Sequence, residues 1–119
     1  MNYVDGYVIP VPKKNLTEYR RIAQKAGKIW CEHGALQYYE CVGEDLNVKW
    51  GVPFPKTLKA KPSETVIFSF IVFKSRAHRD KVNDKVMKDK RLAQMMDNCS
   101  KAFDCKRMVY GGFEVLVDA

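Results

Sequence analysis

The chain has 119 residues, of which 46% are hydrophobic, 12% aromatic and 29% charged, and its formal net charge is +7. These values predict one basic domain over residues 1–119 with a packed core, and they argue against disorder. The longest apolar run, Val66–Phe73, is too short to cross a membrane, and Met1–Asp5 lacks the basic start of a secretory signal. We therefore expect a cytoplasmic protein with no membrane partner.

The first predicted elements are a strand and a long helix. Tyr3–Val11 is rich in Tyr, Val and Ile and ends beside prolines, which a strand tolerates at its end. Asn15, with Glu18 three residues later, predicts a capped helix start. Apolar residues then recur at helical spacing over Leu16–His33, and Gly34 is typical of a left-handed helix end.

Two further strands follow, separated by a long connection. Ala35–Val42 has the composition of a strand. Leu46–Pro62 holds three prolines and is too interrupted for a helix, so we expect a loop that joins two antiparallel strands. Thr65–Phe73 is almost entirely apolar, as expected of a central strand covered on both faces.

The last third of the chain predicts a second helix and a final strand. Ser75 is placed to cap a helix that runs to about Lys88. The short apolar patch Leu92–Met96 indicates one or two further helical turns, and Lys106–Val117 forms the last strand.

The order strand, helix, strand, strand, helix, strand predicts an α+β, ferredoxin-like βαββαβ fold with a four-stranded antiparallel sheet. Such a sheet has helices on one face only, and the first strand would place either Tyr3, Asp5, Tyr7 and Ile9 or Val4, Gly6 and Val8 on the other. Both sets are largely apolar. We therefore expect a second copy to cover this face, giving a homodimer that encloses a small space.

Four blocks of sequence carry a family resemblance. They are Tyr3–Pro12, His33–Leu36 with Glu40-Cys41, Arg76–Asp80 and Lys106–Glu114. Together they resemble the DUF1428 family of small bacterial proteins. The resemblance implies membership of the dimeric α/β-barrel superfamily and no established activity.

Three residues are candidates for catalysis. His33 carries an imidazole suited to proton transfer near neutral pH, although a histidine at a helix end also serves as a cap. Glu40 shares a strand face with Leu36, Tyr38 and Val42, so its pKa would be raised as in a general base, unless a partner holds it for structure alone. Tyr110 is the third candidate.

Candidate ligand contacts include a carboxylate and several aromatic side chains. Asp5 lies on the strand face of Tyr3, Tyr7 and Ile9, as Glu40 does in its own strand. The aromatic residues that could line a pocket, or fill an ordinary core, are Trp30, Trp50, Tyr38, Tyr39 and Tyr110. The full ligand-binding set is Asp5, Tyr7, Trp30, Tyr38 and Met108.

Glycines and cysteines give weaker signals. Gly111 and Gly112 lie within the last strand, which favours a β-bulge over space made for a ligand or a partner. Cys31, Cys41, Cys99 and Cys105 form no C-x-x-C pair, so we expect reduced, mostly buried thiols and no metal. We expect no cofactor.

Three functions remain open. The superfamily resemblance implies a small, partly apolar molecule bound or transformed inside the barrel, as in cofactor-independent monooxygenases and isomerases, but no complete catalytic constellation decides whether this is an enzyme. Two basic segments, Lys13–Lys28 and Lys74–Arg91, together with a label on relatives that mentions signal recognition particle RNA, suggest RNA binding, against solvated helix surfaces as the simpler interpretation. The third possibility is a non-enzymatic dimeric accessory protein.

Overall fold

The computed structural model describes residues 2–119, except for the side chains of residues 96–100. In the described part of the chain, four strands form one antiparallel sheet in the order β2-β3-β1-β4. The strands are β1 (Tyr3–Pro12), β2 (Gln37–Val42), β3 (Glu64–Phe73) and β4 (Val109–Glu114). The helices are α1 (Leu16–Glu32), α2 (Phe54–Thr57), α3 (Arg76–Met87) and α4 (Lys90–Ala102). This arrangement confirms the predicted ferredoxin-like fold.

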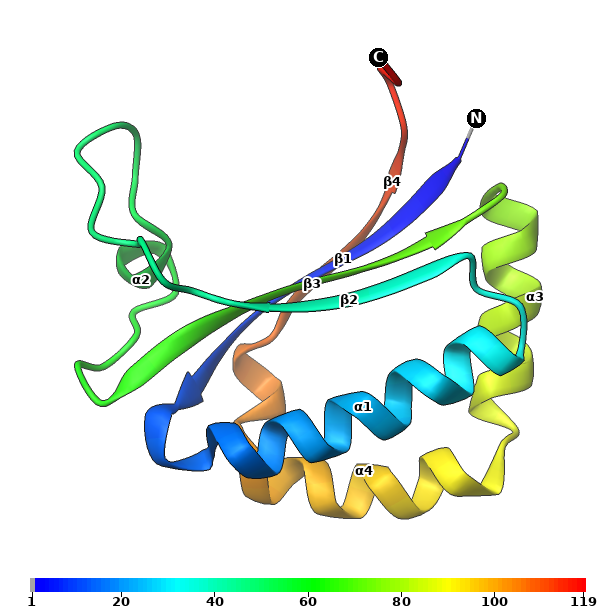
Figure 1. Cartoon of the computed structure of the whole chain (residues 1–119), viewed down its shortest axis with the longest axis horizontal. Helices are drawn as coiled ribbons and strands as arrows, with labels where there is room; N and C mark the ends of the chain where they lie inside the picture. The colour runs from blue at the N-terminus through cyan, green and yellow to red at the C-terminus, as the bar shows by residue number, and fades with distance from the viewer. Residues whose placement is uncertain (1) are drawn as a thin grey trace.

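The helices α1, α3 and α4 cover one face of the sheet, and the loop that contains α2 extends from the opposite side (Figure 1). Strand alternation decides which side chains meet the helices. Tyr7 is opposite Ser69 and Tyr110 on the helix-covered face, whereas Val8 is opposite Phe68 and Val109 on the other, which we call the open face. The open face therefore carries Val4, Gly6 and Val8, the second of the two predicted sets.

The core under the helices consists of two clusters. One joins the end of α1 to α3 through residues such as Ile29, Phe73 and Val82. The other joins the start of α1 to the end of α4 and includes Ile22 and Phe103. Tyr7 and Met95 pack against both clusters. The helices α1, α3 and α4 cover β3 on one face, whereas on the open face Phe68 is 45% exposed although Phe54 of α2 lies in ring contact with it.

The two predicted helix caps have different outcomes. The hydroxyl oxygen of Ser75 accepts a hydrogen bond from the backbone N–H of His78 at 3.1 Å, as predicted for the start of α3. Asn15 precedes α1, but its side-chain oxygen accepts no capping hydrogen bond, and its Nδ2 donates to the carbonyl of Ala102 at 3.0 Å. The predicted cap at Asn15 is wrong, and the side chain instead joins the start of α1 to the end of α4.

The structure also corrects two predicted elements. The segment 90–102 is a full helix where one or two turns were expected, because Leu92 and Ala102 are buried against the core. The connection Leu46–Pro62 contains one helical turn, α2, which begins directly after Pro53. Proline fixes the backbone angle that the first residues of a helix need, so the prolines start this turn rather than prevent it.

The expected bulge at Gly111 and Gly112 is absent. Both residues pair one to one with β1, opposite Gly6 and Asp5. A Cβ atom at Gly112 would lie 2.3 Å from the hydroxyl oxygen of Tyr3. The missing side chain at Gly112 therefore leaves room for the ring of Tyr3, which packs over it.

The cysteines are more accessible than expected. Cys31, Cys41 and Cys105 are free and exposed, so the prediction of mostly buried thiols is wrong for these three. Cys99 lies outside the described side chains. Among the described residues, no group of histidine, cysteine or carboxylate side chains is arranged to hold a metal ion, and no helix has the length and hydropathy to span a bilayer.

Candidate functional site

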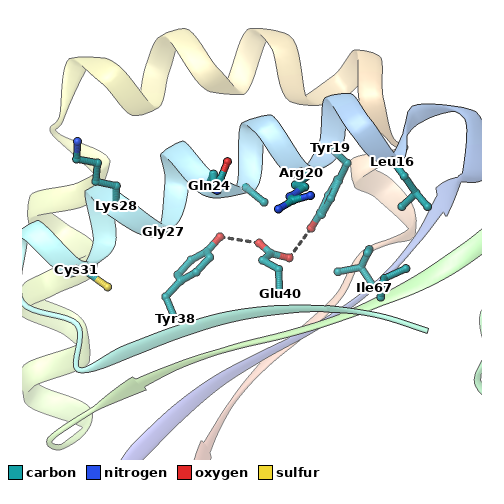
Figure 2. A pocket seen from close by; sticks show the side chains of 12 residues that line it. Leu16, Tyr19, Arg20, Gln24, Gly27, Lys28, Cys31, Tyr38, Glu40 and Ile67 are labelled. Atoms are coloured by element: carbon teal, nitrogen blue, oxygen red, sulfur yellow. Dashed lines mark hydrogen bonds between the residues drawn. The ribbon is translucent and has the colours of Figure 1, made fainter. Parts of the chain in front are cut away.

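Two cavities lie between the sheet and the helices of a single chain. The inner cavity, of about 350 Å³, lies between the two core clusters and is lined by residues of the sheet, α1, α3 and α4. The outer cavity, of about 630 Å³, opens between α1 and β2 (Figure 2). Both differ from the space expected between two sheets of a dimer, because the helices and not a second sheet form their far walls.

Glu40 lines both cavities. The hydroxyl of Tyr19, on α1, donates to its Oε1 at 2.7 Å, and the hydroxyl of Tyr38, two residues away on β2, donates to its Oε2 at 2.6 Å (Figure 2). Ser69 on β3 provides a third side-chain hydrogen bond. Burial raises the pKa of Glu40, and the three hydroxyl groups act in the opposite direction.

Close packing of α1 against β2 allows both tyrosines to reach Glu40. A Cβ atom at Gly27 would lie 2.7 Å from the ring of Tyr38, so the absence of a side chain there lets the ring pack against the helix. Tyr19 and Tyr38 can then reach the carboxylate from opposite sides. The pKa of Tyr38 is raised well above its ordinary value, first by burial and then by the charge of Glu40, which keeps the phenol a donor.

A second polar cluster lies at the α3 end of the inner cavity and is centred on Asp5, which is fully buried. Arg79 on α3 donates to Oδ1 of Asp5 at 2.8 Å, and Asn83, one turn later, donates to Oδ2 at 3.3 Å. The indole N–H of Trp30 donates to Oδ1 of Asn83 at 3.0 Å. Burial raises the pKa of Asp5, whereas the contacts with Asn83 and Arg79 lower it.

Tyr110 connects this second cluster to the cavity wall. Its hydroxyl accepts a hydrogen bond from Arg79 at 3.3 Å, and its ring stacks on Tyr7 with 4.8 Å between centroids. Tyr7, Tyr110 and Met108 all line the inner cavity. Burial raises the pKa of Tyr7 and of Tyr110, so both hydroxyls stay protonated at neutral pH.

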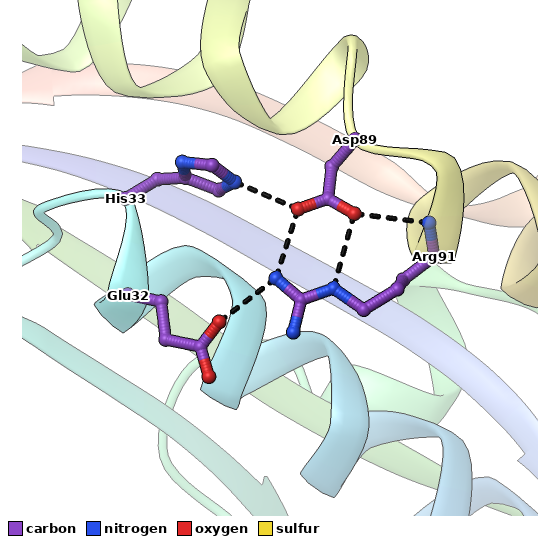
Figure 3. Close-up of polar contacts among 4 residues, drawn as sticks. All are labelled: Glu32, His33, Asp89 and Arg91. Atoms are coloured by element: carbon purple, nitrogen blue, oxygen red, sulfur yellow. Dashed lines mark hydrogen bonds and ion pairs between the residues drawn. The ribbon is translucent and has the colours of Figure 1, made fainter.

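His33 lies outside both cavities. Its Nε2 is 2.8 Å from Oδ2 of Asp89, in a cluster that also contains Arg91 and Glu32 (Figure 3). Hydrogen bonds from Arg91 and then from His33 hold the pKa of Asp89 well below its usual range. This cluster connects the end of α1 to the junction between α3 and α4.

The structure thus places most of the predicted site residues at the inner cavity and a few of them elsewhere. Those that line the inner cavity are Tyr7, Trp30, Tyr38, Glu40, Met108 and Tyr110, and Asp5 is bonded to its wall. Tyr39 is half-exposed on β2, and Trp50 is 92% exposed in the loop before α2. Tyr39 and Trp50 line neither the inner nor the outer cavity.

Sequence reasoning missed Tyr19, Ser69, Arg79 and Asn83. Tyr19 belongs to the apolar stripe of α1. The sequence of a helix does not show whether a tyrosine hydroxyl at such a position contacts a carboxylate or solvent. Arg79 and Asn83 are four residues apart on α3 and so share a helix face. This spacing indicates a polar contact with the sheet, because hydrogen-bond donors that lie beside the inward-facing Val82 and Val86 need a polar partner there.

A ferredoxin-like chain with a cavity between its sheet and helices defines the structural class, and comparison with known sequences then gives the family. Residues 2–105 match the family described as "Protein of unknown function (DUF1428)", and the chain belongs to this family. The uncharacterized protein YbaA of Escherichia coli (strain K12) is 41% identical over 118 residues, which cover 99% of each chain. The uncharacterized protein YbaA of Shigella flexneri is similar to the same extent.

Solved structures support the fold. The cofactor-independent oxygenase SnoaB of Streptomyces nogalater, crystallised as a mutant, matches 98% of this chain and 95% of its own with a TM-score of 0.64 at 8% identity. A NIPSNAP family protein of Agrobacterium tumefaciens matches 96% of this chain and 85% of its own with a TM-score of 0.60 at 13% identity. At these identities the likeness concerns the fold alone.

Proposed function

We propose that this protein binds a small, partly apolar molecule in the inner cavity of each chain. The observation that carries the proposal is a cavity of about 350 Å³ with mostly apolar walls and one carboxylate, Glu40, oriented by two phenols. Binding sites for small molecules have this size and this combination of apolar walls with a few fixed polar groups. Tyr110 and Asn83 add hydrogen-bonding atoms at the other end.

If the bound molecule is transformed, Glu40 is the group equipped to accept a proton. Its raised pKa brings it closer to the range in which a carboxylate acts as a general base. Tyr19 and Tyr38 would act as positioning residues, because each fixes one carboxylate oxygen. The fold shared with the oxygenase SnoaB is compatible with such chemistry and contributes only the fold to the argument.

A cavity-filling variant tests the proposal. Ala26 lines the inner cavity from α1, and Ala26→Phe would place a ring inside it. Ala93→Phe on the exposed side of α4 is the matched control, since it adds the same ring outside both cavities. The full chain is screened for a rise in Tm against planar apolar compounds, including quinols and aldehydes.

We expect at least one compound to raise the Tm of the wild type and of Ala93→Phe, because ligand binding stabilises the folded state by mass action. Ala26→Phe should lose this response while keeping a cooperative unfolding transition. A response that Ala26→Phe retains would place binding elsewhere. A screen without any response would overturn the proposal.

We further propose that two copies associate through the open face. Phe68, Val109 and Phe113 on this face are 45%, 54% and 61% exposed in the single chain. Tyr39 and Phe70 lie in ring contact beside Phe68, so the apolar surface extends across neighbouring strands. A contiguous apolar sheet face is costly to leave in water, and a two-fold pair of sheets would cover it without blocking the cavities on the other side.

A further inference from the structure

The inner cavity has an unbalanced charge. Among the residues that the structure describes, Glu40 is the single charged side chain that lines it. The groups that act on the pKa of Glu40 are burial and three hydroxyls, and no lysine or arginine is among them. The outer cavity has Arg20 and Lys28 in its wall, yet the described contacts include no ion pair between either of them and Glu40.

Asp5, which is fully buried, contrasts directly with the half-buried Glu40. Asp5 has Arg79 at 2.8 Å and is a paired charge inside the protein. Among the described residues, the side chains that donate to Glu40 are neutral hydroxyls, which orient an ionised carboxylate but do not balance its charge. Asp5 therefore has its cation, whereas the half-buried Glu40 has none among the residues that the structure describes.

The carboxylate also retains hydrogen-bonding capacity. An ionised carboxylate accepts about four hydrogen bonds, and Tyr19, Tyr38 and Ser69 account for three. Since Glu40 lines the cavity, a bound molecule can reach the remaining position. A donor that carries a positive charge would make this the strongest contact in the site.

The aromatic walls favour the same ligand. Tyr7, Tyr19, Trp30, Tyr38, Phe103 and Tyr110 line the inner cavity. The face of an aromatic ring attracts cations, and rings around a carboxylate form a suitable enclosure for an ammonium group. The same rings also provide apolar surface for the body of the molecule.

We infer that the ligand of the inner cavity is an organic cation, an amine with a flat or apolar body whose ammonium group pairs with Glu40. This inference rests on the proposed binding function and specifies the charge of its ligand. It follows from the unpaired carboxylate, its free acceptor position and the aromatic walls, taken together.

Three probes of the same shape and different charge test the inference: 1-naphthylmethylamine, 1-naphthalenemethanol and 1-naphthoate. Titration calorimetry on the full chain at pH 7.5 measures the affinity of each. We expect the amine to bind at least tenfold more tightly than the alcohol, a difference of about 1.4 kcal/mol. The naphthoate should bind most weakly.

Two variants locate the charge effect. Glu40→Gln should bring the amine and the alcohol to similar affinities while the alcohol still binds, which also shows that the variant is folded. Glu18→Gln removes an exposed glutamate of α1 that is paired with Arg21 and should leave the tenfold preference intact.

The remaining outcomes are distinct. If the alcohol binds as well as the amine, or the naphthoate binds best, the cation inference is overturned and the binding function stands. A preference for the amine that survives Glu40→Gln also overturns it. If none of the three probes binds, both the inference and the proposed function are contradicted.

Discussion

The guanidinium of Arg79 lies 2.8 Å from the carboxylate of Asp5, and this ion pair joins the first turn of α3 to the N-terminal half of β1. Asp5 is completely buried, and the Arg79 side chain is 13% exposed. The guanidinium also lies 4.8 Å from the ring centre of Tyr3. Arg79 therefore balances the charge of Asp5 and packs on the aromatic ring beside it.

Arg79→Ala should lower the free energy of unfolding by about 3–5 kcal/mol, because it leaves a buried carboxylate without its cation. Adding Asp5→Asn to this variant should recover part of the loss by removing the unbalanced charge. Urea unfolding measures both. Arg76→Ala, at an exposed position of the same helix, is the control and should change stability by less than about 0.5 kcal/mol. Equal effects of Arg76→Ala and Arg79→Ala would contradict the role of the pair.

Glu40 should make stability depend on pH in a definite direction. Because its pKa is raised in the folded state, the folded protein holds this proton more tightly than the unfolded chain. Ionisation of Glu40 therefore costs stability, and the cost grows as the pH rises from about 4.5 through the folded value. The hydroxyls of Tyr19, Tyr38 and Ser69 and the ring of Tyr7 face Glu40 from the neighbouring elements, and the raised pKa values of Tyr7 and Tyr38 keep these two phenols protonated in this range.

The measurement is urea unfolding of the wild type and Glu40→Gln between pH 4 and pH 8. We expect the wild type to lose stability relative to Glu40→Gln as the pH rises. Glu18→Gln should show the opposite sign, because the hydrogen bond from Arg21 lowers the pKa of Glu18. Parallel curves for the wild type and Glu40→Gln would show that Glu40 has no shifted pKa.

Two adjacent glycines should respond differently to the same substitution. Gly112→Ala places a Cβ atom 2.3 Å from the hydroxyl of Tyr3, and the resulting overpacking should cost about 1–3 kcal/mol of unfolding free energy. Gly111→Ala is the matched control, since its Cβ atom meets only the ring of Phe113 at 3.7 Å, an ordinary contact. Thermal unfolding compares the two. A larger loss for Gly111→Ala would disprove the close approach at Gly112.

Phe68→Glu tests the proposed dimer. A carboxylate on the open face would be buried without a partner in the pair of sheets, so the variant should sediment as a monomer while the wild type sediments as a dimer. Ala93→Glu adds the same charge on the exposed side of α4 and should remain dimeric. Circular dichroism checks that Phe68→Glu keeps its helices. A wild type that sediments as a monomer at micromolar concentration would refute the proposal.

The fold was predictable because its signals are local and periodic. The apolar stripe of α1 and the largely apolar run of β3 indicate the element types, and the order of the elements indicates the ferredoxin-like topology. Errors occurred where a distant contact decides the local structure. The sequence predicts that Asn15 caps α1, but its side chain is held by a hydrogen bond from Nδ2 to the carbonyl of Ala102, 87 residues away, and makes no cap.

The candidate site was predictable only in part. The alternation of β2 correctly placed Glu40 beside Tyr38, because that relationship lies within one strand. The hydrogen bond from Tyr19 depends on how α1 crosses β2, and the position of His33 depends on Asp89, 56 residues away. A sequence pattern predicts which side chains share one face of a helix or strand. It does not predict the distance between two elements, on which the contacts of a site depend.

The position of β1 between β3 and β4 has a consequence for synthesis of the chain. Val8 pairs with Val109, so about 100 residues must be added before this partner exists. Because the ribosome adds about 5–20 residues per second, one edge of β1 stays without its hydrogen-bonding partner for roughly 5–20 s during synthesis. Until β4 emerges, the unpaired backbone groups along that edge of β1 are available to other strands, so the sheet is complete only once β4 pairs with β1.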